Sequence, residues 1–182
     1  LSAINNWEDR SSCILFGDGA GAAVVQAEEG ELYPSVAGSD GTMGHVLACE
    51  SRVQNDWQQK EADRKTYIDM DGTAVFKFAV RKMPEMAKSL MTQMHCTEAD
   101  IDWFITHQAN ERIIEAIAKR LKSDIAKFPM NIAECGNTSS ASIPILLDEM
   151  NRSGQLKDGQ KIIMAGFGAG LSWGAVYMEW HA

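Results

Sequence analysis

The chain has 182 residues, of which 45% are hydrophobic and 23% charged, so it is long enough to bury a core and has the composition of an ordinary globular protein. Its formal net charge of −8 and pI near 5.0 argue against nucleic acid as a partner. No apolar run approaches the roughly 20 residues that cross a bilayer, and no signal-peptide pattern opens the chain, so we expect no membrane association.

The first third of the chain predicts strands, a turn and a surface loop. The chain opens on Leu1-Ser-Ala-Ile rather than on methionine, and we expect it to be part of a longer polypeptide. Residues 12–27 predict two strands that meet at a corner formed by Gly17-Asp-Gly-Ala-Gly21. Dinucleotide-binding loops have a similar glycine spacing, but a helix should follow it, and here the apolar pair Val24-Val25 predicts a strand. Residues 49–65 are polar without an apolar stripe, which indicates a surface loop.

Residues 67–94 predict a short strand, a turn and a long helix. The strand covers residues 67–70, the turn residues 71–73, and the helix runs from Ala74 to about Met94 with apolar residues at helical spacing. Pro84 falls inside that helix, so we expect a kink or a junction between two helices there.

Strands and helices alternate in the second half of the chain. Thr97-Glu-Ala-Asp100 resembles a capped turn, and it leads into an apolar strand at residues 101–105. The next helix is expected from Asn110 to Lys122. Five of its residues should face the core: Ile113, Ile114, Ile117, Ala118 and Leu121.

The remaining elements complete an α/β pattern. We expect a strand at residues 127–132, a helix at 139–153 with Gly154 as its C-cap, and two strands, 161–165 and 171–178, joined by a glycine turn. The alternation predicts one α/β domain over residues 1–182, a layered arrangement of a sheet covered by helices. The fully apolar strands fit a sheet that is covered on both faces.

Two polar residues stand where functional side chains are common in such folds. His107 follows a predicted strand and precedes a helix, and Asn137 lies at a second strand-to-helix corner. An imidazole N–H and a carboxamide NH₂ aimed at one point are uncharged donors that suit a developing oxyanion, such as an enolate oxygen. A core histidine and an N-cap asparagine are the structural alternative, and the spacing alone leaves both interpretations open.

Four sequence motifs together resemble β-ketoacyl-acyl-carrier-protein synthase III, a thiolase-like condensing enzyme. They occur in the family's order, and the resemblance runs from about Arg10 to the C-terminus, which corresponds to the C-terminal half of the thiolase-like fold with its mixed sheet. The motifs are Phe16-Gly-Asp-Gly-Ala-Gly-Ala-Ala23, His107-Gln-Ala-Asn110, Cys135-Gly-Asn-Thr-Ser-Ser-Ala-Ser-Ile-Pro144 and Gly166-Phe-Gly-Ala-Gly-Leu-Ser-Trp-Gly174.

The resemblance implies a decarboxylative Claisen condensation that initiates fatty acid biosynthesis. In that reaction His107 and Asn137 stabilise the enolate formed when malonyl-carrier protein loses CO₂, and the carbanion attacks an acyl group, derived from acyl-CoA, on a cysteine. The turn Phe167-Gly168-Ala169 would form the backbone wall of the site, where an N–H holds the carbonyl oxygen of the acyl-enzyme. No cofactor and no metal are implied, because acyl-CoA and malonyl-carrier protein are substrates.

The resemblance also implies binding surfaces. Gly72, Phe76, Ala109 and Asn110 would line the channel for the phosphopantetheine arm of CoA or of the carrier protein; the chain has Thr73 where many members have asparagine.

A basic helical face would dock the acidic acyl carrier protein. Arg112 and Lys119 lie about two turns apart on this face, and Arg120 and Lys122 flank them. An ordinary solvated face remains the alternative for each of these residues.

The nucleophilic cysteine of the family belongs to the other half of the enzyme. None of the four cysteines matches its motif: Cys13 is expected within a strand, Cys49 at a polar loop, Cys96 before a turn, and Cys135 near Asn137. Their scattered positions argue against a disulfide framework or a structural zinc site and favour the reducing cytoplasm. We therefore expect this chain to be inactive alone, and the full-length enzyme, with its N-terminal half, to be a cytoplasmic homodimer.

Other classes remain open. Thiolase proper carries a second catalytic cysteine in the C-terminal glycine loop, which is absent from residues 166–170, and elongating condensing enzymes use two histidines in this half. Polyketide-type condensing enzymes and hydroxymethylglutaryl-CoA synthase are more distant alternatives. A non-catalytic acyl-binding partner subunit is an alternative of another kind, although it would have no physical reason to keep both His107 and Asn137.

Overall fold

The structure is a computed structural model that describes residues 1–26, 29–30, 32–49 and 67–181. Its main element is a four-stranded sheet with the strand order β1-β6-β5-β4. β5 (Lys161–Gly168) pairs antiparallel with β6 (Ser172–Glu179) and parallel with β4 (Trp103–Thr106), while β1 (Ser35–Ser39) pairs antiparallel with β6. The sheet is therefore mixed, as expected.

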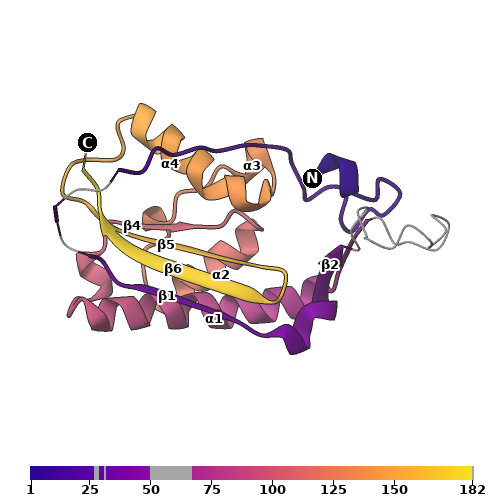
Figure 1. Cartoon of the computed structure of the whole chain (residues 1–182), viewed down its shortest axis with the longest axis horizontal. Helices are drawn as coiled ribbons and strands as arrows, with labels where there is room; N and C mark the ends of the chain where they lie inside the picture. The colour runs from indigo at the N-terminus through magenta and orange to yellow at the C-terminus, as the bar shows by residue number, and fades with distance from the viewer. Residues whose placement is uncertain (27–28, 31, 50–66, 182) are drawn as a thin grey trace.

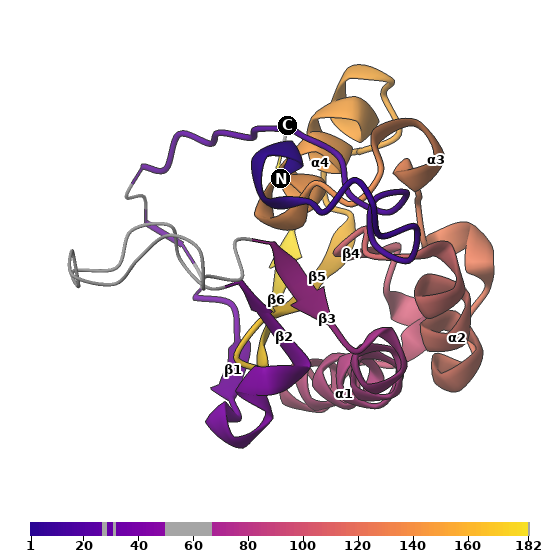
Figure 2. The same ribbon diagram turned by 90° about the vertical axis from the view of Figure 1, so that its right-hand side faces the viewer.

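Helices cover both faces of this sheet (Figures 1 and 2). α1 (Gly72–Gln93) and α2 (Glu111–Leu121) lie on one face, and α4 (Ser142–Arg152) lies with the short α3 (Ile132–Cys135) on the other. Successive side chains of β5 face opposite sides of the sheet. Ile163 belongs to the cluster formed with α1 and α2, whereas Ile162 belongs to the cluster formed with α4. The layered α/β arrangement is confirmed.

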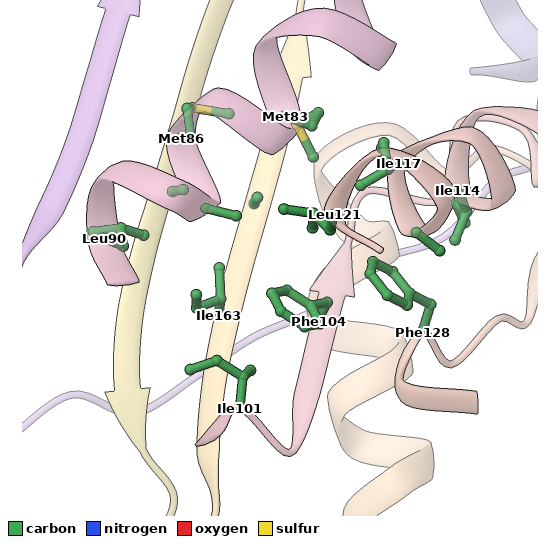
Figure 3. Close-up of a cluster of buried hydrophobic side chains, with 14 of the residues drawn as sticks. Met83, Met86, Leu90, Ile101, Phe104, Ile114, Ile117, Leu121, Phe128 and Ile163 are labelled. Carbon is green, nitrogen blue, oxygen red and sulfur yellow. The ribbon is translucent and has the colours of Figure 1, made fainter. Parts of the chain in front are cut away.

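The larger core fills the space between α1, α2 and the sheet (Figure 3). Phe104 of β4 stacks on Phe128, with ring centroids 4.8 Å apart and the rings 9° from parallel. The labelled side chains of this cluster point toward one another from both helices and from the strands; they include Met83, Met86, Leu90, Ile114, Ile117, Leu121 and Ile163. All five residues expected to face the core from α2 are buried, so that prediction is correct.

Short elements complete the chain. β2 (Leu47–Cys49) and β3 (Ile68–Met70) form a two-stranded antiparallel ribbon. The capped turn at residues 97–100 is confirmed, because Thr97 and Asp100 form a capping box. The described 3₁₀ segments are Ser2–Ile4, Gly41–Val46, Glu98–Asp100, Ile125–Lys127 and Ser139–Ala141.

Helix α1 starts earlier than expected and is not divided at its proline. Asp71 is the N-cap, and its carboxylate accepts hydrogen bonds from the backbone N–H groups of Thr73 and Ala74, both at 3.0 Å. The helix continues through Pro84, so a junction between two helices is wrong, while the alternative expectation of a kink stays a prediction. Pro84 removes one backbone hydrogen bond, but it is buried, and burial of the apolar side chains along α1 compensates for that loss.

The two strands expected at residues 12–27 are wrong. Cys13 lies in a turn, Phe16 makes an isolated bridge to Asn137, and residues 17–26 form no ladder. Strand-forming side chains need a neighbouring strand for their backbone groups, and no described segment lies beside Val24 and Val25, which are 99% and 92% exposed.

The strand expected at residues 127–132 is also wrong. The segment has no ladder with β4, and its last residue, Ile132, is the first residue of α3. Its apolar Phe128 is buried by stacking rather than by strand pairing, and Pro129 cannot donate a ladder hydrogen bond. Most of the surface loop expected at residues 49–65 lies outside the described residues.

Candidate active site

A cavity of about 820 Å³ opens where the end of β4 meets the starts of α1 and α2. This volume is typical of a site for a small molecule or a substrate arm. Residues 137–142 and the end of β5 form another part of the wall. The lining includes ten of the residues singled out from the sequence, namely His107, Asn137, Phe167, Gly168, Ala169, Gly72, Phe76, Ala109, Asn110 and Arg112.

His107 is held at the end of β4 by backbone and side-chain contacts. Its N–H donates to the carbonyl of Ala165 at 2.9 Å, and its Nδ1 lies 2.7 Å from Oγ of Ser142. The ring of Phe167 packs edge-on against the imidazole, with centroids 5.6 Å apart. Burial lowers the pKa of His107 from its usual 6.5 to about 4, because the charged form loses solvation. The imidazole is therefore neutral at pH 7.

Asn137 is fixed on both sides by its neighbours. Its backbone N–H donates to Leu15 at 2.8 Å, and its carbonyl accepts from Gly17 at 2.9 Å, which makes the bridge around Phe16. Its Oδ1 accepts a hydrogen bond of 2.9 Å from the backbone N–H of Ser139. The Nδ2 group of Asn137 is thus the end of the amide that can donate to a ligand. Asn137 is not the helix N-cap of the structural alternative, since Thr138 has that position for Ser139–Ala141.

The close approach of two loops explains the glycines around Asn137. Gly136 has a φ of +66°, and a Cβ there would also come within 3.2 Å of the Leu15 carbonyl oxygen. A Cβ on Gly17 would lie 2.1 Å from the carbonyl oxygen of Cys135. The glycine-rich segment therefore positions Asn137. The described residues that follow it, 22–26, form no helix, which agrees with the sequence argument against a dinucleotide loop.

The expected backbone wall lies at the end of β5. Phe167 and Gly168 are still within the strand, so the turn is shorter than expected and begins at Ala169. Phe167 also packs against Phe78 of α1, with centroids 6.4 Å apart. This contact fixes the wall of the cavity against α1.

The residues expected to line a substrate channel come from the starts of two helices. Gly72 is the first residue of α1, and Phe76 follows one turn later and is 37% exposed. Asn110 caps α2, because its Oδ1 accepts the N–H of Arg112 at 2.9 Å. Ala109 precedes it. Their roles in substrate binding remain predictions.

The basic residues expected at a docking surface lie on the exposed side of α2. Arg112, Lys119, Arg120 and Lys122 are all exposed, but Arg112 is the one of these four that lines the cavity. Lys119 and Arg120 lie in the last turn of α2 and Lys122 is its C-cap, and the exposed side of the helix also carries Glu111 and Glu115. The docking role of the four cations remains a prediction.

Sequence reasoning overlooked the contributions of Ser142, Gln108 and Cys49. Ser142 contacts His107. The next residue, Gln108, is fully buried, and its side-chain NH₂ donates to the carbonyl of Thr106 at 2.8 Å. Both belong to the motifs noted above, but their contacts depend on the tertiary fold. Cys49 lines the cavity from the end of β2.

Among the described residues, no group of three or more His, Cys, Asp or Glu side chains is placed to hold a metal ion. The described helices include none that combines the length and the apolar character needed to cross a membrane.

Two family models match the chain. A model described as 3-oxoacyl-[acyl-carrier-protein (ACP)] synthase III C terminal matches residues 91–180, and one described as 3-oxoacyl-[acyl-carrier-protein (ACP)] synthase III matches residues 1–41. A β-ketoacyl-[acyl-carrier-protein] synthase III from Clostridium novyi (strain NT) is 45% identical over 183 residues, which cover 100% of this chain and 56% of the relative. The chain thus spans little more than half the length of this relative.

Solved structures show the same similarity. A crystal structure of 3-oxoacyl-[acyl-carrier-protein] synthase III from Aquifex aeolicus VF5 matches with a TM-score of 0.88 and 38% identity, covering 99% of this chain and 55% of that one. The priming β-ketosynthase from the R1128 polyketide biosynthetic pathway matches with a TM-score of 0.82 and 34% identity, covering 98% of this chain and 54% of that one. The fold is therefore that of the thiolase-like condensing enzymes.

Proposed function

Because the chain belongs to the 3-oxoacyl-[acyl-carrier-protein] synthase III family, we propose that it is the C-terminal part of an enzyme that initiates fatty acid biosynthesis. The reaction is the condensation of an acyl-CoA with malonyl-acyl carrier protein. The observation that carries this proposal is that His107 and Asn137 line one cavity as two neutral donors.

The proposed chemistry uses both donors at one oxygen. Loss of CO₂ from the malonyl thioester leaves the electrons of the broken C–C bond on the α-carbon as an enolate. A neutral His107 and the Nδ2 group of Asn137 stabilise the enolate oxygen, and the α-carbon then attacks the acyl thioester on the enzyme. The new C–C bond forms as the cysteine thiolate leaves. A general base is not needed, which suits a histidine with a pKa of about 4.

The nucleophilic cysteine is proposed to lie in a part of the enzyme beyond these 182 residues. Burial raises the pKa of the Cys96 and Cys135 thiols, which disfavours the reactive thiolate. Cys13 does not line the cavity, and Cys49 lines it from the ribbon rather than from the strand-to-helix elbow that the family uses. We therefore propose that this chain alone does not turn over.

Exposed apolar side chains support a partner from the rest of the enzyme. Ile14 is 77% exposed, Val24 and Val25 more than 90%, and Leu32 fully, which is unusual for a surface that faces water. We propose that the N-terminal half covers these side chains and that the complete enzyme acts as a cytoplasmic homodimer.

Substrate binding is assigned to the remaining cavity walls. The thiol end of the phosphopantetheine arm would pass between Phe76 and Asn110 to reach His107, all of which line the cavity. The exposed cations of α2 would dock the acidic carrier protein at the mouth. The backbone of Phe167-Gly168-Ala169 would support the acyl-enzyme.

A second candidate is the priming condensation of a polyketide pathway. The match to the R1128 priming ketosynthase favours it, because that enzyme is similar over nearly the whole of this chain. Both candidates use the same decarboxylative step, so they differ in carrier protein rather than in the roles of His107 and Asn137.

The proposal is tested with the full-length protein. CO₂ release and product formation are measured with an acyl-CoA primer and malonyl-carrier protein, and fatty acid and polyketide carriers are compared. Activity with neither carrier would contradict the proposal. For the chain alone, intact mass after incubation with acyl-CoA should show no acyl adduct, whereas a stoichiometric adduct on Cys135 or Cys49 would contradict the missing nucleophile.

A further inference from the structure

We propose that Ser142 is a positioning residue that sets the tautomer of His107, so that the imidazole carries its proton on Nε2, the nitrogen that Ser142 does not contact. The catalytic consequence rests on the proposed function, but the tautomer itself does not.

The contact between the two residues is short and buried. Ser142 is the first residue of α4 and is 3% exposed, and its Oγ lies 2.7 Å from Nδ1 of His107. A hydroxyl at this depth must find its hydrogen-bond partners within the protein. The contact therefore has a defined direction, with one group donating and the other accepting.

A backbone amide decides that direction. The N–H of Gln108 lies 3.3 Å from Ser142 Oγ and can only donate, so the oxygen accepts there. Nδ1 of His107 is the one acceptor within hydrogen-bond distance of the hydroxyl among the residues described. If Nδ1 were the donor instead, the hydroxyl proton would have no acceptor, which costs about 1–3 kcal/mol for a buried group.

Because the Ser142 hydroxyl donates to Nδ1, the hydrogen of the neutral imidazole must be on the other ring nitrogen, Nε2. A neutral imidazole that accepts at one nitrogen carries its hydrogen on the other. His107 is neutral at pH 7, because burial lowers its pKa to about 4. Nε2 is therefore an N–H donor, which is the form that an enolate oxygen requires.

A hydrogen-bonded network holds Ser142 and His107 in register. The buried Gln108 side chain accepts the N–H of Asn131 at 3.3 Å, and Asn131 Nδ2 donates to Glu149 at 2.7 Å. Glu149 and Ser142 are both on α4, about two turns apart. These hydrogen bonds connect the end of β4, the loop before α3 and α4, and the Ser142 contact belongs to the same network.

The tautomer can be read directly by NMR. The protein is labelled with [¹⁵N]histidine, and long-range proton–nitrogen correlations of the ring are recorded at pH 7. The chain has four histidines, so His107→Gln identifies the signals that belong to His107. We expect a protonated Nε2 and an unprotonated Nδ1. A protonated Nδ1 in the unsubstituted protein would overturn the proposal, whether or not any variant folds.

Three serine variants then test the role of Ser142. Ser142→Ala should give a mixture of tautomers, and Ser142→Thr, which keeps the hydroxyl, should restore the Nε2–H form. Ser89→Ala is the matched control, because Ser89 is exposed on α1. An unchanged tautomer in Ser142→Ala would overturn the proposal.

A kinetic measurement on the full-length enzyme separates this inference from the proposed function. If both hold, Ser142→Ala lowers kcat for CO₂ release with little change in KM, and Ser142→Thr recovers it. If the NMR result is as expected but kcat is unchanged, the tautomer assignment stands and the enolate-stabilising role of His107 is contradicted.

Discussion

The side chain of Asn137 and the backbone of Ser139 form a closed turn at the cavity wall. The Ser139 N–H donates to Asn137 Oδ1 at 2.9 Å, and Ser139 has a φ of +57°, in the left-handed region. A donor at Oδ1 settles which end of the amide is which, so Nδ2 remains for a ligand. The orientation of the Asn137 amide is thus fixed by a residue, Ser139, whose own backbone conformation is unfavourable.

We expect Ser139→Gly to stabilise the chain by about 0.5–1 kcal/mol. Glycine adopts a positive φ without the steric cost of a Cβ, and this gain exceeds its larger loss of entropy on folding. The measurement is the free energy of unfolding in denaturant. Ser140→Gly is the matched control, because Ser140 is also exposed but has no positive φ. This substitution should lower the free energy of unfolding of the chain by about 0.5–1 kcal/mol. Equal effects at the two positions would contradict a cost located in the backbone of Ser139.

The stability of the chain should depend on pH through His107. The pKa of His107 is about 4 in the folded chain and about 6.5 when unfolded, so between these values the unfolded state binds more protons. The contribution of His107 to the free energy of unfolding is therefore complete above pH 6.5 and is lost as the pH drops from 6.5 to 4. The loss is at most about 3.5 kcal/mol, because one pKa unit corresponds to about 1.4 kcal/mol.

The comparison is between the unsubstituted chain and His107→Gln, with denaturant unfolding measured at several pH values. Glutamine cannot titrate, so the difference in the free energy of unfolding between the two proteins should change with pH only through the titration of His107. A difference that stays constant from pH 7 to pH 4 would show that His107 is not held neutral by burial.

The cationic face of α2 predicts a local effect on binding of the carrier protein. Lys119→Glu and Arg120→Glu in the full-length enzyme should each weaken binding roughly fivefold, since an exposed ion pair contributes up to about 1 kcal/mol, and the effect should shrink at high salt. Surface plasmon resonance with immobilised carrier protein measures it. Lys157→Glu is the control, because Lys157 is exposed in the loop that enters β5, at the end of the sheet opposite to His107. Equal losses for all three variants would indicate a general charge effect and no docking surface.

Elements with strong local signals were predicted well from the sequence. The helix from Glu111 to Leu121 has both a cap and an apolar stripe, and its buried residues are those expected. The position of His107 between a strand and a helix was also predicted correctly. Asn137, by contrast, follows the short helix α3 and not the strand that was expected before it.

The predictions that were wrong, and the contact that was overlooked, concern structure that depends on residues distant in the sequence. Residues 12–27 and 127–132 have strand-like composition, but a strand exists only beside another strand, and local composition cannot say whether one is available. A kink or a junction between two helices was expected at Pro84, but α1 continues through it as one helix. The Ser142–His107 contact joins residues 35 positions apart, and nothing in either segment alone indicates it.

The most direct test of the account is a double-mutant cycle on CO₂ release from malonyl-carrier protein by the full-length enzyme. His107→Ala and Asn137→Ala should each lower kcat by about 10²- to 10³-fold, as expected for loss of one oxyanion donor. The double variant should lose less than the product of the two effects, because both donors act on one oxygen. Full-rate CO₂ release by either single variant would contradict the assignment of His107 and Asn137 as the enolate-stabilising pair.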